Sequence, residues 1–503
     1  MSEGPPRNTT DDEFLDLTEK LERLAEDRER LAALDPEVRR RLLMAAGRLS
    51  RPDRDEWRAR TRAIRRKERA ALEAADEAAL EATGIREARR APVYRTPRPA
   101  LGWADAPEAQ RPGAAPRLNE PRKCYVCKAE YLELHAFYDQ LCPPCAELNW
   151  AKRHQTADLR GRTALVTGGR VKIGYQASIM LLRAGARVLV TTRFPRDAAK
   201  RYAAEPDFAA FAPRLALFGL DLRHTPSVDL FARRLAEREQ RLDFVLHNAC
   251  QTVRRPPGFY AHLVEAERAP PEALPPAERE VLRDFHALRA EPALGGARGL
   301  LDAPALSQAA ALGEDRLLDA ARLTLFPAGQ LDQDLQQIDL RGINSWRLKL
   351  GEVPTVELLE VQLVNAVAPF VLTSALRPLL ARDGGRDKHV VNVSAMEGQF
   401  YRAHKTDKHP HTNMAKAALN MLTRTSAADL VKDGIHMNSV DTGWVTDEDP
   451  VAIAVRKVEE HGFSPPLDIV DGAARICDPI FAGLRSGEHA FGLFFKDYKP
   501  IPW

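Results

Sequence analysis

The sequence predicts an α/β protein built on a doubly wound parallel sheet, preceded by a helical region and a small metal-binding segment. Three observations support this prediction. Short apolar runs alternate with helical segments from about residue 157 onward. Two close pairs of cysteines precede these runs, and the residues before the cysteines are rich in Glu, Arg, Ala and Leu. With 503 residues, the chain has room for about three domains.

The composition excludes several classes of protein. Hydrophobic residues make up 44% and charged residues 29%, as in ordinary soluble proteins, so neither wholesale disorder nor a fibrous repeat is expected. The formal net charge of +3 is too small to favour nucleic acid or a membrane surface as a partner. The polar start lacks the design of a secretion signal, and no stretch approaches about 18 uncharged apolar residues. We therefore expect a cytoplasmic protein without a membrane partner.

Residues 1–115 are predicted to form a helical region followed by a linker. Leucines recur at helical spacing, and Pro36 and Pro52 interrupt the pattern, which predicts two or three helices. Alternating charges after Pro52 are typical of a solvated helical face, and docking of a protein partner is the alternative. Residues 93–120 are rich in proline, alanine and glycine, as expected of an extended linker at a domain boundary.

Four cysteines in residues 116–156 form the pattern CxxC-x14-CxxC. Each pair can present two thiolates to one ion, and two pairs complete the tetrahedral four-sulfur shell that zinc prefers. Because four thiolates leave no open position, we expect a structural zinc ion. The alternatives are a thioredoxin-like redox pair or a ribbon that binds nucleic acid, and the weak charge of the segment favours a structural role. The predicted ligands are Cys124, Cys127, Cys142 and Cys145.

The predicted sheet begins with a strand, a turn and a helix. The run RTALVTG ends in glycine, a helix is expected over Tyr175–Ala184, and RVLVTT follows as the second strand. Five more strands are predicted in the runs RLALFGLD, DFVLHNA, KHVVNVS, GIHMNSV and HAFGLFF. In a doubly wound sheet of this kind, the ligand binds at the carboxyl ends of the strands.

The turn after the first strand, TGGRVKIG, resembles the TGxxxGxG turn of the short-chain dehydrogenase/reductase superfamily. The resemblance covers residues 157–503 and implies a Rossmann-type domain that binds a nicotinamide dinucleotide. Glycines let the backbone approach the pyrophosphate, and the helix N-terminus attracts phosphate. Lys172 replaces the middle glycine, where it either places an ammonium near a phosphate or blocks the site. The turn residues expected to bind the cofactor are Thr167, Gly168, Gly169, Arg170, Lys172, Ile173 and Gly174.

Further cofactor contacts follow from the same resemblance. The second strand ends in Arg193 rather than in an acid, which favours the 2′-phosphate of NADP over the free ribose of NAD; an exposed loop arginine is the alternative. Asp221 matches the acid that contacts adenine, and Asn248 matches the asparagine of the NNAG segment. The stretch around Gly443 resembles the one that closes over the nicotinamide, although a threonine replaces its proline.

The spacing between Asn248 and Asn365 exceeds what the family needs by many tens of residues. This predicts an insertion over about 256–353, read as a partly helical excursion that forms a lid or a partner surface. Its segments GFYAHL and INSWRLKL are candidates for a substrate wall.

The catalytic residues implied by the resemblance are incomplete. Ser394 matches the serine that positions the carbonyl oxygen, Lys416 matches the lysine that binds the ribose, and Asn365 matches the asparagine of the proton relay. Where the family has its acid/base tyrosine, four residues before the lysine, this chain has a threonine. A threonine hydroxyl is too weak an acid for that role. The candidates to replace the tyrosine are Tyr401, in a loop of unusual length, and His411, whose ordinary pKa is near neutrality.

Two functions are consistent with these residues. The first is an NADP-dependent oxidoreductase that transfers hydride between nicotinamide and a small-molecule carbonyl or alcohol. The second is a sensor or scaffold that binds a dinucleotide without catalysis. Relatives commonly pair through the helices that contain Asn365 and Lys416, so a homo-oligomer is expected.

Overall fold

A computed structural model describes residues 9–97, 116–256, 259–291, 297–307, 309, 324–327, 329–401, 405–446, 448–461 and 464–503. The chain forms two compact units, Met1–Glu77 and Ala78–Trp503. This division falls before the predicted linker, of which residues 98–115 lie outside the described residues.

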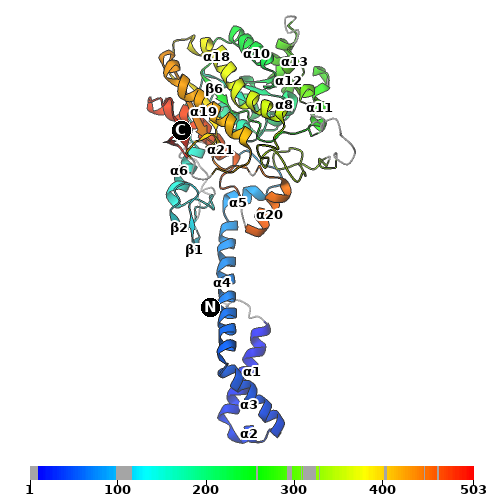
Figure 1. The fold of residues 1–503 in the computed structure, drawn as a ribbon, viewed down its shortest axis with the longest axis vertical. Coiled ribbons are helices and arrows are strands. Elements are labelled where there is room, and N and C mark those ends of the chain that lie inside the picture. The colour runs from blue at the N-terminus through cyan, green and yellow to red at the C-terminus, as the bar shows by residue number, and fades with distance from the viewer. Residues whose placement is uncertain are drawn as a thin grey trace. The chain divides into compact units, whose positions relative to one another are not determined.

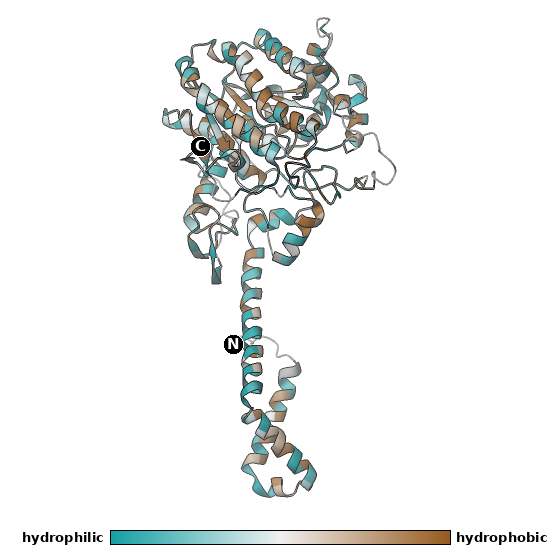
Figure 2. Ribbon diagram, in the orientation of Figure 1, coloured by the Kyte–Doolittle hydropathy of each residue, from teal (hydrophilic) through white to brown (hydrophobic). Residues whose placement is uncertain are grey.

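The N-terminal part contains more helices than the two or three predicted (Figure 1). Asp27 and Asp35 each accept two backbone hydrogen bonds at the start of a helix, so aspartate caps divide the segment as well as prolines. Figure 2 shows a largely hydrophilic α4, as expected of a solvated helix. The helices are α1 (Thr9–Glu26), α2 (Arg28–Ala32), α3 (Pro36–Ser50), α4 (Arg54–Glu81) and α5 (Gly84–Arg90).

The cysteine segment shares a hydrophobic core with the large sheet domain. It consists of an antiparallel pair, β1 (Arg117–Lys123) and β2 (Glu130–Glu133), followed by helix α6 (Pro143–Arg153). Leu134 and Tyr138 of this segment belong to the same buried cluster as Ile469 and Val470. The segment is therefore packed onto the domain that follows it.

The central sheet has eight strands in the order β10-β9-β8-β7-β6-β3-β4-β5. All neighbouring strands are parallel except β9 and β10. This confirms the predicted doubly wound α/β fold, and strand order reverses between β3 and β6. The strands are β3 (Thr163–Thr167), β4 (Arg187–Thr192), β5 (Leu215–Gly219), β6 (Phe244–His247), β7 (Lys388–Ser394), β8 (Ile435–Asp441), β9 (Phe494–Lys496) and β10 (Lys499–Ile501).

One predicted strand is displaced. The run HAFGLFF was expected to be a strand throughout, but β9 begins only at Phe494. Gly492 has a positive φ of 68°, and the N–H of Leu493 bonds the side-chain oxygen of Asn438. Gly492 and Leu493 still bond the backbone of Met437 and Ser439 in β8, but the regular strand begins only after them.

Helices cover both faces of the sheet. α7 packs against α21, whereas α10 packs against α18, and α19 packs against β7 and β8. The bounds are α7 (Lys172–Arg183), α8 (Pro195–Ala203), α9 (Phe208–Phe211), α10 (Thr225–Arg238), α17 (Thr355–Gln362), α18 (Ala368–Ala381), α19 (Pro410–Leu430), α20 (Val451–His461) and α21 (Ile469–Ser486).

The described part of the predicted insertion contains short helices, and α12 packs against β5 and α8 at one edge of the sheet. Phe259, Tyr260 and Phe326 form a small apolar cluster with Phe194 of the segment after β4. The helices are α11 (Ala261–Arg268), α12 (Pro276–Arg289), α13 (Arg298–Leu301) and α14 (Ala303–Leu306).

Among the described residues, one helical stretch is apolar and long enough to cross a membrane, Thr355–Ala381, which differs from the expectation that no such stretch is present. Half of its most apolar window is buried within the fold. Its second part, α18, packs against α10, β6 and β7 as a layer of the sheet domain.

Candidate functional site

The glycine turn lies where the order of the strands reverses. Gly168 follows β3 with a φ of +71°, a conformation that favours glycine. A Cβ on Gly174 would lie 2.2 Å from Nδ2 of Asn248 and 2.4 Å from the carbonyl oxygen of Gly168. The same Nδ2 donates to the carbonyl oxygens of Thr167 and Gly168, at 3.1 and 3.2 Å. Asn248 therefore joins the turn after β3 to the end of β6.

Lys172 keeps the backbone conformation that glycine would adopt at its position. Its φ is +55°, in the left-handed region. Burial would lower the pKa of its ammonium, but the carboxylates of Glu448, Asp334 and Asp332 outweigh burial and raise the pKa. The replacement thus preserves the path of the turn and adds a cation.

A cavity of about 340 Å³ lies beneath the turn. It is within the size range of small-molecule sites. Thr167, Gly169, Lys416 and Gly443 are not among its described lining residues. The predicted cofactor residues that line it are Gly168, Arg170, Lys172, Ile173, Gly174, Arg193, Asp221 and Asn248.

Two guanidinium groups, those of Arg170 and Arg193, border the cavity near one aromatic ring. They lie 5.5 and 5.7 Å from the ring centre of Phe194. Arg193 also donates to the hydroxyl of Tyr260 at 3.0 Å and lies over its ring. Burial would raise the pKa of Tyr260, but Arg193, Arg170 and Arg255 together lower it. This side of the cavity is therefore strongly cationic.

Asp221 is held by an arginine. Arg223 donates to both of its carboxylate oxygens, the shortest contact being 2.7 Å, and also to Glu360 at 2.9 Å. Burial would raise the pKa of Asp221, but these bonds to Arg223 lower it. Glu360 accepts a further bond from Gln251 at 2.9 Å. Arg223, Gln251 and Glu360 were not predicted from the sequence: no motif marks Arg223, two residues after Asp221, and Gln251 and Glu360 come from distant parts of the chain.

Ser394 and Lys416 are buried near the carboxyl end of β7 but do not line the cavity. Ser394, the last residue of β7, donates from Oγ to Oδ1 of Asn420 at 2.6 Å. Nζ of Lys416, on α19, donates to the carbonyl oxygen of Val393 at 2.7 Å. Each of these bonds therefore joins β7 to α19.

Asn365 lies in a short π-helix, η5 (Leu363–Val367), between α17 and α18. Such bulges often mark functional sites, because the extra residue changes the direction of a side chain. Oδ1 of Asn365 accepts from the N–H of Gln251 at 2.8 Å, and Nδ2 donates to the carbonyl oxygen of Gln251 at 3.2 Å. Both polar atoms of the Asn365 side chain therefore form hydrogen bonds with the backbone after β6.

The two candidate proton donors differ in burial. Tyr401 is 89% exposed, so the structure does not bring it to the site, whereas His411 is 1% exposed. Nε2 of His411 lies 3.7 Å from Oε1 of Glu357. Burial would raise the pKa of Glu357, but His411 and Ser345 lower it. Beside His411, the hydroxyl of Thr412 is buried without a hydrogen-bond partner among the described residues.

Gly443 contacts the cysteine segment. It has a φ of +74°, and a Cβ there would lie 2.5 Å from Leu467. The next residue, Trp444, donates its N–H to the hydroxyl of Tyr125 at 2.9 Å. Tyr125 stands beside Cys124, so the cysteine segment borders the loop that follows β8.

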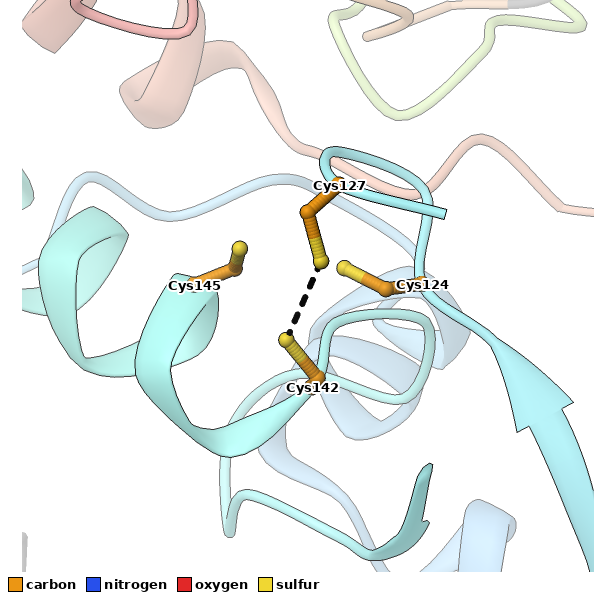
Figure 3. A group of neighbouring side chains, drawn as sticks. All are labelled: Cys124, Cys127, Cys142 and Cys145. Atoms are coloured by element: carbon orange, nitrogen blue, oxygen red, sulfur yellow. Dashed lines mark hydrogen bonds between the residues drawn. The ribbon is translucent and has the colours of Figure 1, made fainter. Parts of the chain in front are cut away.

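The sulfur atoms of the four cysteines converge (Figure 3). All lie within 4.8 Å of one another, and those of Cys127 and Cys142 are 3.5 Å apart. Cys124 and Cys127 come from the turn after β1, whereas Cys142 and Cys145 come from the start of α6. The donor set and its spacing fit a tetrahedral zinc ion.

A doubly wound sheet with a glycine turn over a cavity at its reversal point is the architecture of nucleotide-binding α/β proteins. The short chain dehydrogenase family model matches residues 162–263, and the Enoyl-(Acyl carrier protein) reductase model matches residues 342–461. The chain belongs to the short-chain dehydrogenase/reductase superfamily, a family of oxidoreductases. The unmatched residues 264–341 fall inside the predicted insertion.

Similar proteins include one uncharacterized protein and two named as a dehydrogenase/reductase or a reductase. Uncharacterized protein R665 of Acanthamoeba polyphaga mimivirus is 31% identical over 376 residues, which are 73% of this chain and 72% of that protein. Dehydrogenase/reductase SDR family member 13 of Bos taurus is 36% identical over 118 residues, 23% of this chain and 29% of that protein. The 5-keto-D-gluconate 5-reductase of Escherichia coli strain K12 is 29% identical, over 30% of this chain and 56% of the enzyme. The match thus spans less than two thirds of these last two proteins.

Solved structures with similar chains include an RhlG/NADP active-site complex from Pseudomonas aeruginosa, with a TM-score of 0.41 and 19% identity over 67% of this chain and 95% of that chain. A dehydrogenase/reductase from Sinorhizobium meliloti 1021 has a TM-score of 0.42 and 18% identity over 70% of this chain and 96% of that chain.

Proposed function

We propose that this protein is an NADP-dependent oxidoreductase that transfers hydride between the nicotinamide and a small-molecule carbonyl or alcohol carbon. The observation that carries the proposal is the cationic side of the cavity beneath the glycine turn. When bound, the dinucleotide supplies or accepts the hydride. The chain's own residues bind the cofactor, orient the substrate oxygen and move a proton.

Arg193 is the residue proposed to select NADP. It follows β4, lines the cavity and forms no ion pair among the described residues, whereas Arg170 is paired with Asp197 at 2.7 Å. A guanidinium without a carboxylate partner can form a bidentate pair with a 2′-phosphate, through two parallel hydrogen bonds. Lys172, Gly168 and Gly174 are proposed to hold the pyrophosphate, since they form the turn and the start of α7.

Ser394 and Lys416 are proposed to act at the opposite end of the cofactor. The hydroxyl of Ser394 can turn from Asn420 to a substrate oxygen, and the ammonium of Lys416 can leave the Val393 carbonyl for a ribose hydroxyl. His411 is the better-placed of the two proton donors, because its ring is buried within 3.7 Å of Glu357. Tyr401 would have to leave the solvent to take this role.

Calorimetric titration with NADPH and with NADH tests cofactor choice. We expect NADPH to bind more tightly, and Arg193→Ala to weaken NADPH by about 1.5–3 kcal/mol, the strength of a charged hydrogen bond, while NADH binding stays unchanged. Arg233→Ala is the matched control, because this exposed arginine pairs only with Asp229 on the same helix among its described contacts. Equal affinities for the two nucleotides in wild type and Arg193→Ala would exclude the proposed role.

A second candidate function is dinucleotide binding without turnover. The threonine at the tyrosine position and the 89% exposure of Tyr401 favour it. Tight NADPH binding without consumption of NADPH across a screen of aldehydes and ketones would support this sensor or scaffold role.

Assembly and the metal complete the proposal. We propose a structural zinc ion at the four cysteines and a homo-oligomer through the helices around Asn365 and Lys416, on which Phe370, Met414 and Met421 are at least half exposed. Analytical ultracentrifugation tests the oligomer.

The N-terminal helices are proposed to bind a protein partner, because the apolar side chains of Phe14 and Trp57 are exposed there. Cross-linking in a cytoplasmic extract tests this proposal.

A further inference from the structure

Three histidines converge at the end of the sheet opposite the cavity. His389 lies near the start of β7, His436 near the start of β8, and His489 in the segment after α21. One potential ligand nitrogen from each lies within 4.8 Å of the others. Because parallel strands begin at the same edge of a sheet, this cluster lies a full strand length from the glycine turn.

The hydrogen bonds of the cluster leave nitrogen lone pairs available. Nδ1 of His436 bonds the carbonyl oxygen of Lys388 at 3.1 Å. A carbonyl only accepts, so this nitrogen carries the hydrogen and Nε2 keeps its lone pair. Metal-binding histidines are commonly oriented by such a bond. Nε2 of His389 lies 2.9 Å from Nδ1 of His489, and Nδ1 of His389 is buried without a partner among the described residues.

A glycine keeps the space beside the rings open. A Cβ on Gly483, in α21, would lie 2.6 Å from Nδ1 of His489 and 3.2 Å from Nε2 of His389. Any other residue would therefore push against the two nitrogens that face each other. The helix that passes the cluster has no side chain at this point, so the two rings can both approach one ion.

Charged groups of both signs surround the cluster. Burial and the two neighbouring imidazoles lower the pKa of His389, and neutral imidazole is the form in which histidine binds metals. The carboxylate of Asp387 acts on all three rings, raising their pKa values against this trend. It is paired with Arg162 at 2.8 Å, and the guanidinium groups of Arg162 and Arg386 oppose its effect on the rings.

We propose that His389, His436 and His489 bind a divalent transition-metal ion, with zinc as the expected metal. Three neutral imidazoles form a borderline-soft donor set that suits zinc. The ion would replace the hydrogen between His389 and His489, and that hydrogen would move to the other nitrogen of its ring. Because His489 is partly exposed, the fourth position is open to water. The ion would join the starts of β7 and β8 to the segment before β9.

Zinc stoichiometry in the full-length protein tests the site, measured by plasma mass spectrometry together with calorimetric titration of zinc. We expect wild type to bind one zinc ion more per chain than His489→Gln or His436→Gln. We also expect Cys127→Ser to lose a different ion, so the double variant with His489→Gln loses both. His286→Gln, a partly exposed histidine on α12, is the matched control and should bind as wild type does.

Cobalt(II) spectra keep the two sites distinguishable. Thiolate-to-cobalt charge transfer reports the cysteines, whereas cobalt bound to imidazoles lacks this band. We expect Cys127→Ser to retain the cobalt d–d spectrum of the histidine site. Adding His489→Gln to this variant should remove that spectrum and weaken cobalt binding by at least about tenfold. Identical zinc content and cobalt spectra in wild type, His489→Gln and His436→Gln would overturn the proposal.

Discussion

The guanidinium of Arg153 forms two hydrogen bonds with the carboxylate of Asp468, at 2.6 and 2.7 Å, and both side chains are buried. Arg153 ends α6 of the cysteine segment, and Asp468 caps the start of α21. Oδ1 of Asp471 accepts a further bond from Arg153 and one from the hydroxyl of Tyr138. One buried ionic network thus fastens the cysteine segment to a helix that covers the sheet.

Removal of Arg153 should be strongly destabilising. Arg153→Ala leaves two carboxylates buried without their cation, so we expect a loss of about 3–5 kcal/mol in the free energy of unfolding. Arg160→Ala breaks an exposed pair with Asp158 and should change the stability little, because water screens such a pair. Urea unfolding of the two variants measures the difference, and equal midpoints would show that the buried network contributes little.

Acid should remove a defined part of the stability. Burial would raise the pKa of Asp243, but bonds from Arg241, Lys388 and the N–H of Thr163 lower it to about 2. Because the folded pKa is below the unfolded value, this stabilisation is present above about pH 4 and is lost as the pH falls toward 2. The shift corresponds to roughly 2 kcal/mol. Unfolding of wild type and Asp243→Asn across this range should show a smaller pH dependence in the variant.

The helix start should not tolerate a larger residue in place of Gly174. A methyl group there would meet Asn248 and the carbonyl of Gly168, so Gly174→Ala should weaken NADPH binding by more than about tenfold. Gly47→Ala is the control, because nothing lies within 4 Å of that position in α3, and it should stabilise its helix by about 0.5–1 kcal/mol. Unchanged NADPH affinity in Gly174→Ala would show that the backbone can shift without cost.

Zinc removal should loosen the loop after β8. The hydroxyl of Tyr125 accepts the N–H of Trp444, and Tyr125 stands between the first two cysteines. Chelation, or Tyr125→Phe, should increase amide hydrogen exchange across residues 442–446, with a loss of about 1 kcal/mol for the single hydrogen bond. Peptides from β5, on the other side of the sheet, serve as the internal reference. Exchange that changes equally in both regions would indicate global destabilisation instead.

Steady-state kinetics of single variants should distinguish the proposed catalytic roles of Ser394, His411 and Tyr401. Ser394→Ala should lower kcat/KM by about a hundredfold, as the loss of an oxygen-orienting donor does. His411→Gln should lower kcat and remove a limb of the pH profile, whereas Tyr401→Phe should leave both unchanged because Tyr401 is exposed. Loss of activity in Tyr401→Phe alone would identify that tyrosine as the proton donor.

The strands of the sheet were predictable because they are buried on both faces, which leaves largely apolar runs such as those of β3 and β5. The turn and the cysteine pairs were predictable because their residues are adjacent in sequence. The bond from Arg223 to Glu360 was not, since it joins the loop after β5 to α17. The histidine cluster was missed for the same reason: its members come from β7, β8 and a later loop, with no characteristic spacing.

The side-chain amide of Asn365 forms two hydrogen bonds with the backbone of Gln251, one through its oxygen and one through its nitrogen. Gln251 lies in the first stretch that matches the family and Asn365 in the second, so this pair bridges the insertion at its base. The residues between them can therefore lengthen, shorten or change in composition while the two halves of the sheet stay in register. Natural variation in this family branch should accumulate there, except at residues such as Arg255 and Tyr260 that line the cavity.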